Sequence, residues 1–256
     1  MTAVLIGFEY QDLIGTVYDL YHAYKYLSAL DFHITIITDI KEVKYNISQL
    51  HQDVDDSFYT FLNSSEVIRV DNAKELNESL KKVKIYGPLF FYFSGHGVEK
   101  GILCPNKTIY SFDLIREYVD IPLSFTVLDC CYANNLKLPY YYSRDRPRLI
   151  KEYKEAKISV NSLFLFTSSK EDEIAKSEEG GSYFTKHLFT LLYRCFQRLR
   201  KINVSSLIFE LNRHALKYGV ERYAAYCSLP SLHNLPLFLF GKKEIDKIGP
   251  FYILKL

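Results

Sequence analysis

Six short runs of apolar residues recur along the chain and predict six buried strands. Most of the runs are continuously apolar rather than alternating, which is typical of strands covered on both faces. β-Branched and aromatic residues are common in them, as in "FHITIIT" and "LFFYF". The runs lie at residues 3–8, 32–38, 87–97, 124–131, 162–169 and 235–241.

Between these runs, apolar residues recur at the three-to-four-residue spacing of amphipathic helices. Asn72 and Ser111 precede two helical stretches and are expected to cap them, because their side-chain oxygens can accept hydrogen bonds from the first free amides. A small hairpin is predicted over 101–110, with its turn at Pro105-Asn106. The predicted helices span residues 16–30, 72–82, 111–119, 183–199 and 204–218.

The alternation of strands and helices predicts an α/β fold, with a six-stranded, mostly parallel sheet and helices on both of its faces. A chain of 256 residues is long enough for one large domain. Residues 39–70 show no clear periodicity beyond a short helix. Only the segment 137–157 has the composition of a linker, since it is polar and rich in basic residues. We therefore expect a single domain over 1–256.

Composition and charge argue against several classes of protein. Hydrophobic residues make up 48% and charged residues 24% of the chain, so a disordered protein is not expected. The net charge of +2 is too small for a nucleic-acid-binding domain, which usually carries a clustered basic excess. No apolar run has the roughly eighteen residues that cross a bilayer, and the N-terminus does not resemble a signal peptide. The five cysteines include no C-x-x-C pair, so we expect reduced thiols in a cytoplasmic protein.

Two of the apolar runs end in residues that can carry chemistry. "YFSGHG" places His96 after the third run, and "VLDCC" places Cys130 and Cys131 at the end of the fourth. The carboxyl ends of neighbouring parallel strands meet at one edge of a sheet, so an imidazole and a thiol are expected to lie together there. Such a pair can perform nucleophilic catalysis, because the imidazole activates the thiolate and later protonates the leaving group. The amides of Gly97 and of the nucleophilic cysteine would then face the developing oxyanion.

Other interpretations of the same residues are open at this point. A buried histidine beside glycine and a cysteine at a strand end are often structural. A metal site formed by His96, Cys104, Cys130 and Cys131 is a second interpretation, although the spacing usual for zinc ligands is missing. A nucleotide-binding domain is a third, but the glycines after the first strand form neither G-x-G-x-x-G nor a phosphate-binding loop.

The two motifs and their surroundings resemble the caspase-like cysteine peptidases, and among these the metacaspases. The resemblance extends to "VLIGFEY", "YDLYHAYKYLSALDFHITIITD", "LFTSSKEDEIAKSEEGGSYFTKHLFTLL" and "LPLFLF", which span nearly the whole chain. It implies a Cys–His endopeptidase in which His96 is the base and Cys131 the nucleophile. It also implies a large-subunit-like part (1–136), a linker loop (137–157) and a small-subunit-like part (158–256) within the one domain.

The resemblance further implies the substrate class, because metacaspases cleave after Arg or Lys and bind this side chain with acidic groups. Asp129 lies at the family's pocket aspartate, and Asp19 at a position where the family often has aspartate. Ser94 is expected to help shape the same pocket. Carboxylates there would form charge-assisted hydrogen bonds with a cationic side chain. The expected partners are proteins or peptides with Arg or Lys at the cleaved position; nucleic acids and membranes are not expected as partners. The alternative interpretation of Asp19 is a solvated residue on the surface of a helix.

Departures from the family pattern affect the cofactor and the activity. Many metacaspases require calcium, but Ser111 and Phe112 stand where the family has two acids, and Asn106 where it has an aspartate. Calcium takes six to eight oxygen ligands, which a phenylalanine cannot supply. We therefore expect no cofactor and no metal site. Tyr132 replaces the histidine that usually follows the nucleophile, so an inactive or weakly active caspase-fold scaffold is the alternative function.

The basic loop 137–157 has a second meaning under this resemblance, since metacaspase chains are commonly cut between the fourth and fifth strands. An enzyme selective for basic residues could cut its own loop, and an ordinary solvated loop is the alternative. The candidate self-cleavage sites are Arg144, Arg146, Arg148 and Lys151. The oligomeric state is not predicted by the sequence.

Overall fold

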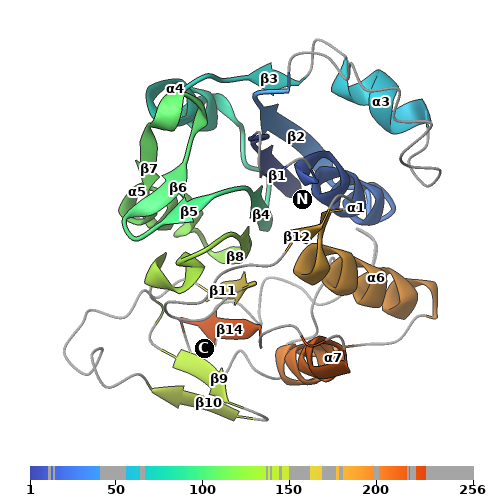
Figure 1. The fold of residues 1–256 in the computed structure, drawn as a ribbon. Coiled ribbons are helices and arrows are strands. Elements are labelled where there is room, and N and C mark those ends of the chain that lie inside the picture. The colour runs from blue at the N-terminus through green and yellow to red at the C-terminus, as the bar shows by residue number, and fades with distance from the viewer. Residues whose placement is uncertain are drawn as a thin grey trace.

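A nine-stranded sheet forms the centre of the part of the chain that the computed structural model describes (Figure 1). That part comprises residues 1–10, 13, 15–40, 56–63, 67–136, 138, 140–143, 146–149, 162–168, 177–178, 181–198, 202–217, 219 and 223–228. The strands of the sheet are β1 (Thr2–Gly7), β2 (His33–Thr38), β3 (Ile68–Arg69), β4 (Leu89–Ser94), β8 (Leu123–Asp129), β9 (Tyr140–Ser143), β10 (Arg146–Leu149), β11 (Ser162–Thr167) and β14 (Ala224–Cys227). Across the sheet they follow the order β10-β9-β14-β11-β8-β4-β1-β2-β3.

The sheet is mostly parallel, as predicted. Strands β11, β8, β4, β1, β2 and β3 run parallel to one another, whereas β14, β9 and β10 form an antiparallel edge. The prediction of six strands is wrong, because the described sheet has nine. The four unpredicted strands β3, β9, β10 and β14 have only two to four residues each, too few to form a recognisable apolar run. The strand predicted over 235–241 lies outside the described residues.

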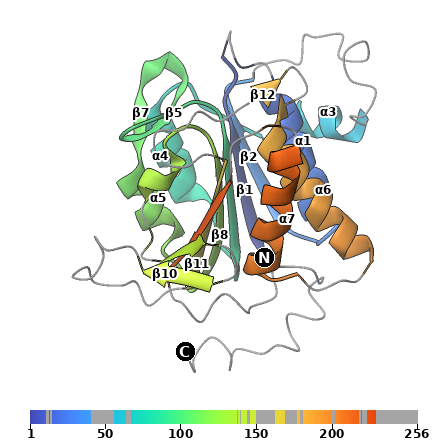
Figure 2. The same ribbon diagram turned by 60° about the horizontal axis from the view of Figure 1, so that its bottom comes forward.

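Helices cover both faces of the sheet, which confirms the predicted layers (Figure 2). One face carries α1 (Thr16–Ser28), α6 (Tyr183–Gln197) and α7 (Val204–Lys217). The other carries α4 (Ala73–Lys82) and α5 (Phe112–Val119). A further helix, α3 (Asp56–Leu62), contacts α1 through Phe61, whose ring stacks on that of Tyr24 with 5.0 Å between centroids.

Each face of the sheet has its own apolar core, and this explains why the strands are continuously apolar. Ala3 and Leu5 of β1 pack into the core beneath α1 and α6, whereas Val4 and Ile6 pack into the core on the opposite face. Successive side chains of a strand point to opposite faces, so a strand buried on both sides needs apolar residues at every position. The burial of β1 is complete at all six positions.

Local capping and turn chemistry are as predicted. The side chain of Asn72 accepts a hydrogen bond from the Glu75 amide at 3.0 Å, and that of Ser111 accepts one from the Leu114 amide at 3.2 Å. The hairpin joins β6 (Gly101–Leu103) to β7 (Ile109–Ser111) and, with β5 (Gly97–Val98), forms a small antiparallel sheet. Its turn is the short segment η1 (Pro105–Lys107), which is kinked at Asn106.

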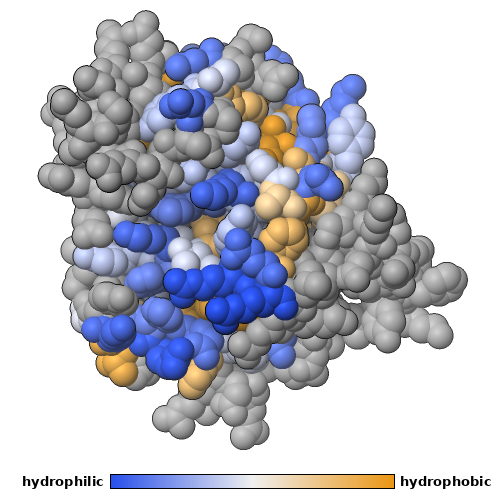
Figure 3. All heavy atoms as spheres, turned by 90° about the vertical axis from the view of Figure 1, so that its right-hand side faces the viewer, coloured by the Kyte–Doolittle hydropathy of each residue, from blue (hydrophilic) through white to orange (hydrophobic). Residues whose placement is uncertain are grey.

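On the side of the molecule that carries α1, α6 and α7, the described residues are mainly hydrophilic, with smaller groups of hydrophobic side chains between them (Figure 3). Phe209 and Leu216 of α7 are the most exposed large apolar side chains among the described residues. No helix in the described ranges combines the length and the apolar character needed to cross a membrane.

Candidate active site

The carboxyl ends of β4 and β8 form the candidate active site. These strands are parallel neighbours, and their last residues, Ser94 and Asp129, are paired in register. His96 lies two residues beyond Ser94, and Cys131 lies two residues beyond Asp129. The structure therefore places the histidine and the cysteine at the same edge of the sheet, each two residues beyond the end of its strand.

Gly97 brings the two chain segments into backbone contact. A Cβ atom built on Gly97 would lie 1.9 Å from the carbonyl oxygen of Cys131 and 3.0 Å from Sγ of Cys130. Because no side chain fits between them, the backbone after His96 lies directly against the backbone of Cys131. Both His96 and Cys131 are half-buried, so they remain accessible from the edge of the sheet.

The amide of Gly97 is directed away from the β5–β6 ladder. Gly97 is paired with Ile102, and the adjacent hydrogen bond runs from the Leu103 amide to the His96 carbonyl at 2.9 Å. In an antiparallel ladder, the residue pair next to such a bond makes no hydrogen bonds of its own across the ladder. The N–H and C=O groups of that pair point away from the partner strand. The Gly97 amide therefore faces away from β6, an orientation in which it can serve a ligand.

The turn that follows Cys131 is tied to the segment that follows His96. Tyr132 has a φ of 57°, a left-handed conformation that is uncommon for a residue other than glycine, and its side chain is exposed. The following 3₁₀ segment, η2 (Ala133–Leu136), contains Asn135, whose side-chain amide donates to the Glu99 carbonyl at 2.8 Å. This bond links the turn after the cysteine to the small sheet after the histidine.

The two adjacent cysteines differ in environment. Cys130 is 1% exposed, and burial together with Asp129 raises the pKa of its thiol well above the usual value. Cys131 is half-buried at the edge of the sheet. Since the thiolate is the reactive form and must reach a substrate, the structure favours Cys131 over Cys130 as a nucleophile.

A pair of buried carboxyl groups lies beneath this edge. Asp19 comes from the first turn of α1 and Asp129 from the end of β8, and both are almost fully buried. Ser94 donates from Oγ to Oδ2 of Asp19 at 2.6 Å, so the predicted pocket residues Asp19 and Ser94 are in contact. The structure thus brings together all three residues that the sequence assigned to the pocket.

Three further residues, for which the sequence predicted no role, surround the carboxyl pair. The Ser182 amide donates to Oδ1 of Asp19 at 2.8 Å, and Thr185 donates from Oγ1 to Oδ2 of Asp129 at 2.5 Å. The hydroxyl groups of Thr185 and Tyr92 are 2.7 Å apart. The signal for Ser182 and Thr185 was present in the quoted segment "GGSYFT", which resembles the family but carried no assigned role.

Burial controls the charge of the carboxyl pair. Burial, and then the neighbouring Asp129, raise the pKa of Asp19 well above its usual value, whereas the bonds from Ser94 and Ser182 lower it less. Burial likewise raises the pKa of Asp129. None of the described groups acting on Asp19 is cationic. Two buried carboxyl groups without a cation favour retention of a proton, and a bound cation would reverse this preference.

Gly181 allows the chain to cover the carboxyl pair. It belongs to β13 (Gly181–Ser182), which pairs with β12 (Ser177–Glu178), and its φ is +98°. A Cβ atom on Gly181 would lie 2.6 Å from Oδ1 of Asp19. The close approach and the positive φ both require glycine at this position.

Two of the three positions relevant to calcium line a surface pocket of about 530 Å³ beside the candidate site. Ser111 and Phe112 are on its wall, where the resembling family has acids. The other lining residues are Glu99, Lys100, Asp113, Arg116 and Asn135. Arg116 donates from Nε to the Leu136 carbonyl at 3.1 Å, so a guanidinium occupies part of this wall. The third position, Asn106, lies in the η1 turn with a φ of 58°.

The cysteines of the alternative metal site are poor candidates for thiolates. Burial raises the pKa of Cys104 to about 12, and Cys130 is shifted in the same direction. Without a bound metal, both thiols therefore favour the protonated form. Within the ranges that the structure describes, no cluster of three or more His, Cys, Asp or Glu side chains is arranged to hold a metal ion.

The candidate self-cleavage sites are only partly described. Arg146 and Arg148 lie in β10, which is paired with β9, whereas Arg144 and Lys151 lie outside the described residues.

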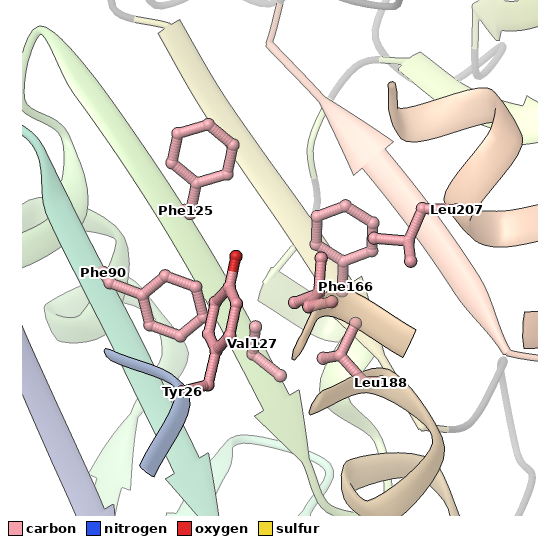
Figure 4. A pocket seen from close by; sticks show the side chains of 8 residues that line it. Tyr26, Phe90, Phe125, Val127, Phe166, Leu188 and Leu207 are labelled. Carbon is pink, nitrogen blue, oxygen red and sulfur yellow. The ribbon is translucent and has the colours of Figure 1, made fainter. Parts of the chain in front are cut away.

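A separate cavity lies in the core between the sheet, α1 and α6 (Figure 4). Its volume is about 20 Å³, and Tyr26 contributes the one hydroxyl group among its otherwise apolar lining side chains, which include Phe90, Phe125 and Phe166. A space of this size holds about one water molecule. This cavity is therefore a packing defect rather than a substrate site.

Comparisons with known proteins agree with this geometry. The family model described as the caspase domain matches residues 1–214. The chain belongs to the caspase-domain family. This membership supports the fold of a cysteine-type peptidase and, with it, protein substrates. A search of the curated proteins found no match.

Solved structures with the same fold as this caspase-domain protein include two of low sequence identity. Caspase-1 from Spodoptera frugiperda is 13% identical, with a TM-score of 0.54 over 94% of this chain and 90% of the other. A structural-genomics target protein from Geobacter sulfurreducens is 10% identical, with a TM-score of 0.55 over 94% of this chain and 99% of the other. At these identities the similarity establishes the fold alone.

Proposed function

We propose that this caspase-domain protein is a cysteine endopeptidase of the metacaspase type that cleaves after Arg or Lys. One observation carries the proposal: the edge that holds His96 and Cys131 lies above two buried carboxyl groups, Asp19 and Asp129. His96 and Cys131 can break an amide bond. Asp19 and Asp129 can bind the cationic side chain of the residue before that bond.

The proposed reaction follows from the positions of the groups. The thiolate of Cys131 attacks the scissile carbonyl, and the amides of Gly97 and Cys131 stabilise the oxyanion. The C–N bond breaks as the His96 imidazolium protonates the leaving amine, which leaves a thioester on the cysteine. Water then attacks the thioester while His96 accepts its proton, so the carboxylate product and the thiolate are restored.

The proposed specificity follows from charge. A guanidinium or ammonium group supplies the counter-charge that the buried Asp19 and Asp129 lack among the described residues. Its binding would form charge-assisted hydrogen bonds and release the proton that the pair retains. An aspartate at the cleaved position would instead add a third carboxyl group to the pocket. Peptides with aspartate there are therefore expected to be poor substrates.

We also propose that the activity does not require calcium. The wall of the neighbouring pocket has Ser111 and Phe112 where the family has acids, and its two acids, Glu99 and Asp113, are balanced by Lys100 and Arg116. The wall therefore carries no net negative charge to attract a divalent cation, and Phe112 offers such an ion no oxygen from its side chain. Arg116, bonded to Leu136, already holds the wall to the turn after Cys131.

Self-cleavage within 137–157 is a further part of the proposal. The bonds after Arg146 and Arg148 lie in a paired strand, so the β9–β10 pairing must open before either bond can enter an active site. Incubation of the active protein should yield two fragments separated within this loop, and Cys131→Ala should remain intact. A single intact band after prolonged incubation of the active protein would exclude processing.

The test of the main proposal is a panel of fluorogenic peptides with Arg, Lys or Asp at the cleaved position, assayed with calcium and with EGTA. Hydrolysis of the Arg and Lys peptides alone, abolished in Cys131→Ala and unchanged by EGTA, is expected. Cleavage after Asp would refute the specificity, and loss of activity in EGTA would refute calcium independence.

A scaffold function is the alternative, and Tyr132 in place of the usual histidine favours testing it. An Arg-directed peptide ketone distinguishes the two functions, because it labels a competent nucleophile even when turnover is slow. Labelling of Cys131 with measurable turnover supports the peptidase. Absence of both labelling and turnover in the folded protein would show that the caspase fold serves as a scaffold here.

A further inference from the structure

Tyr10 lies against the imidazole of His96. The two ring centroids are 4.6 Å apart, and the planes are tilted by 51°. Tyr10 follows β1, the strand adjacent to β4, and Gly7 of β1 is paired with Ser94. The tyrosine and the histidine therefore reach the same edge of the sheet from neighbouring strands.

Both ends of Tyr10 are held in place. Its hydroxyl group donates to the carbonyl oxygen of Leu103 in β6, and its backbone exchanges hydrogen bonds with Leu13. The Leu103 amide in turn donates to the His96 carbonyl at 2.9 Å. The ring of Tyr10 and the backbone of His96 are thus attached to the same residue, Leu103.

The backbone around His96 needs such support. His96 is flanked by Gly95, which has a φ of +154°, and by Gly97. Glycine restricts the backbone least of all residues, so two glycines beside a histidine leave its orientation to be determined by contacts elsewhere. An aromatic ring in contact with the imidazole restricts its rotation and also attracts its protonated form.

We propose that Tyr10 is a positioning residue for His96: its anchored ring holds the imidazole toward Cys131 and stabilises the imidazolium of a thiolate–imidazolium pair. In other Cys–His peptidases a third polar residue orients the histidine, and the sequence pattern alone indicated no such residue in this chain. The catalytic meaning of this inference rests on the proposed function, whereas the ring contact itself does not.

The experiment compares Tyr10→Leu, Tyr10→Phe and the matched control Tyr86→Leu. Tyr86 is 57% exposed and its ring contacts that of His33, 6.4 Å away, before β4 and far along the strands from His96. The control therefore removes a tyrosine–histidine contact that the proposal does not involve. Two quantities are measured as a function of pH: the rate of Cys131 alkylation by iodoacetamide, and kcat and KM for an Arg peptide.

Tyr10→Leu should slow Cys131 alkylation about two- to fivefold near neutral pH and move the acidic limb of its pH profile upward, because the imidazolium loses its aromatic partner. It should lower kcat about tenfold with little change in KM, because the histidine is misoriented rather than the substrate unbound. Tyr10→Phe, which keeps the ring and loses the bond to Leu103, should keep the wild-type acidic limb and lose less than about threefold in kcat. Tyr86→Leu should match the wild type.

An unchanged alkylation profile in a folded Tyr10→Leu variant would overturn the inference, as would an equal effect of Tyr86→Leu. If Tyr10→Leu does not fold, NMR of the wild-type protein tests the contact between Tyr10 and His96 instead. The His96 ring protons should then be shifted upfield by the tyrosine ring, and signals at the positions of an isolated histidine would overturn the inference. If the wild type hydrolyses no peptide, the proposed function fails, but alkylation and NMR still test the contact.

Discussion

Replacement of Gly97 by alanine tests whether the His96 and Cys131 segments must touch. The added Cβ would lie 1.9 Å from the Cys131 carbonyl oxygen, whereas ordinary contact begins at 3.4 Å. The overlapping atom belongs to the backbone, so no side-chain rotation can relieve the clash. The two segments must instead move apart by about 1.5 Å, unless the backbone of one segment rearranges.

The magnitude of the effect follows from this displacement. Overpacking of this kind typically costs about 1–3 kcal/mol of stability. Misplacement of reacting groups by about 1 Å can cost about a hundredfold in rate. We therefore expect Gly97→Ala to fold with a melting temperature lowered by several degrees and to lose about a hundredfold in kcat/KM for an Arg peptide.

Gly101→Ala is the matched control, because it introduces a similar clash away from Cys131. Its Cβ would lie 2.1 Å from the Tyr110 carbonyl oxygen, between β6 and β7. It should lose stability to a similar extent and keep most of its activity. The assays are thermal unfolding, peptide hydrolysis and the rate of Cys131 alkylation.

Wild-type activity in Gly97→Ala would refute the backbone contact on which the candidate site is built. Equal losses of activity in Gly97→Ala and Gly101→Ala would show that the small sheet is damaged generally, and that the loss does not report on the His96–Cys131 separation.

Three further predictions concern charge. Burial and Asp39 raise the pKa of Glu9 to about 7, so the folded protein binds this proton more tightly than the unfolded chain. The stability that this proton contributes is present below about pH 4.5 and is lost as the pH rises through about 7. Urea unfolding should show that the free energy of unfolding falls by about 1–2 kcal/mol over this range, after solvent screening is allowed for, and Glu9→Gln should remove this pH dependence. Binding of an Arg peptide to the Cys131→Ala protein should be coupled to proton release, since the pKa of Asp19 is raised in the free protein; calorimetry in two buffers should show the release, and adding Asp19→Asn should reduce it. Arg116→Met should lower stability by about 1–3 kcal/mol in thermal unfolding, because the buried Leu136 carbonyl loses a donor, and added calcium should not restore it.

Much of the fold could be predicted because it depends on residues close together in the sequence. The caps at Asn72 and Ser111 involve partners three residues away, and the β6–β7 turn is encoded by Pro105-Asn106. The runs that end before His96 and Cys131 were also recognisable, since strands buried on both faces are continuously apolar.

The prediction of the fold from sequence was weaker where tertiary contacts, rather than the local pattern of apolar residues, determine the structure. Strand β14 and the β9–β10 hairpin were missed because four-residue strands are stabilised by the neighbours they pair with. Tyr10 lies in the quoted segment "VLIGFEY", but the resemblance implied no role for it. A tyrosine after a strand is ordinary in sequence, and its contact with His96 depends on the adjacency of β1 and β4.

The sequence alone determined the alternation of strands and helices, and with it the placement of a histidine and a cysteine after successive buried strands. Only the tertiary structure decided that Ser94 meets Asp19 across 75 residues and that Ser182 meets it across 163. It also decided the charge of the carboxyl pair, because the pKa of Asp19 depends on how completely the surrounding elements exclude water. Periodicity and capping act over a few residues, whereas strand order, close approach and desolvation arise only when distant segments pack together.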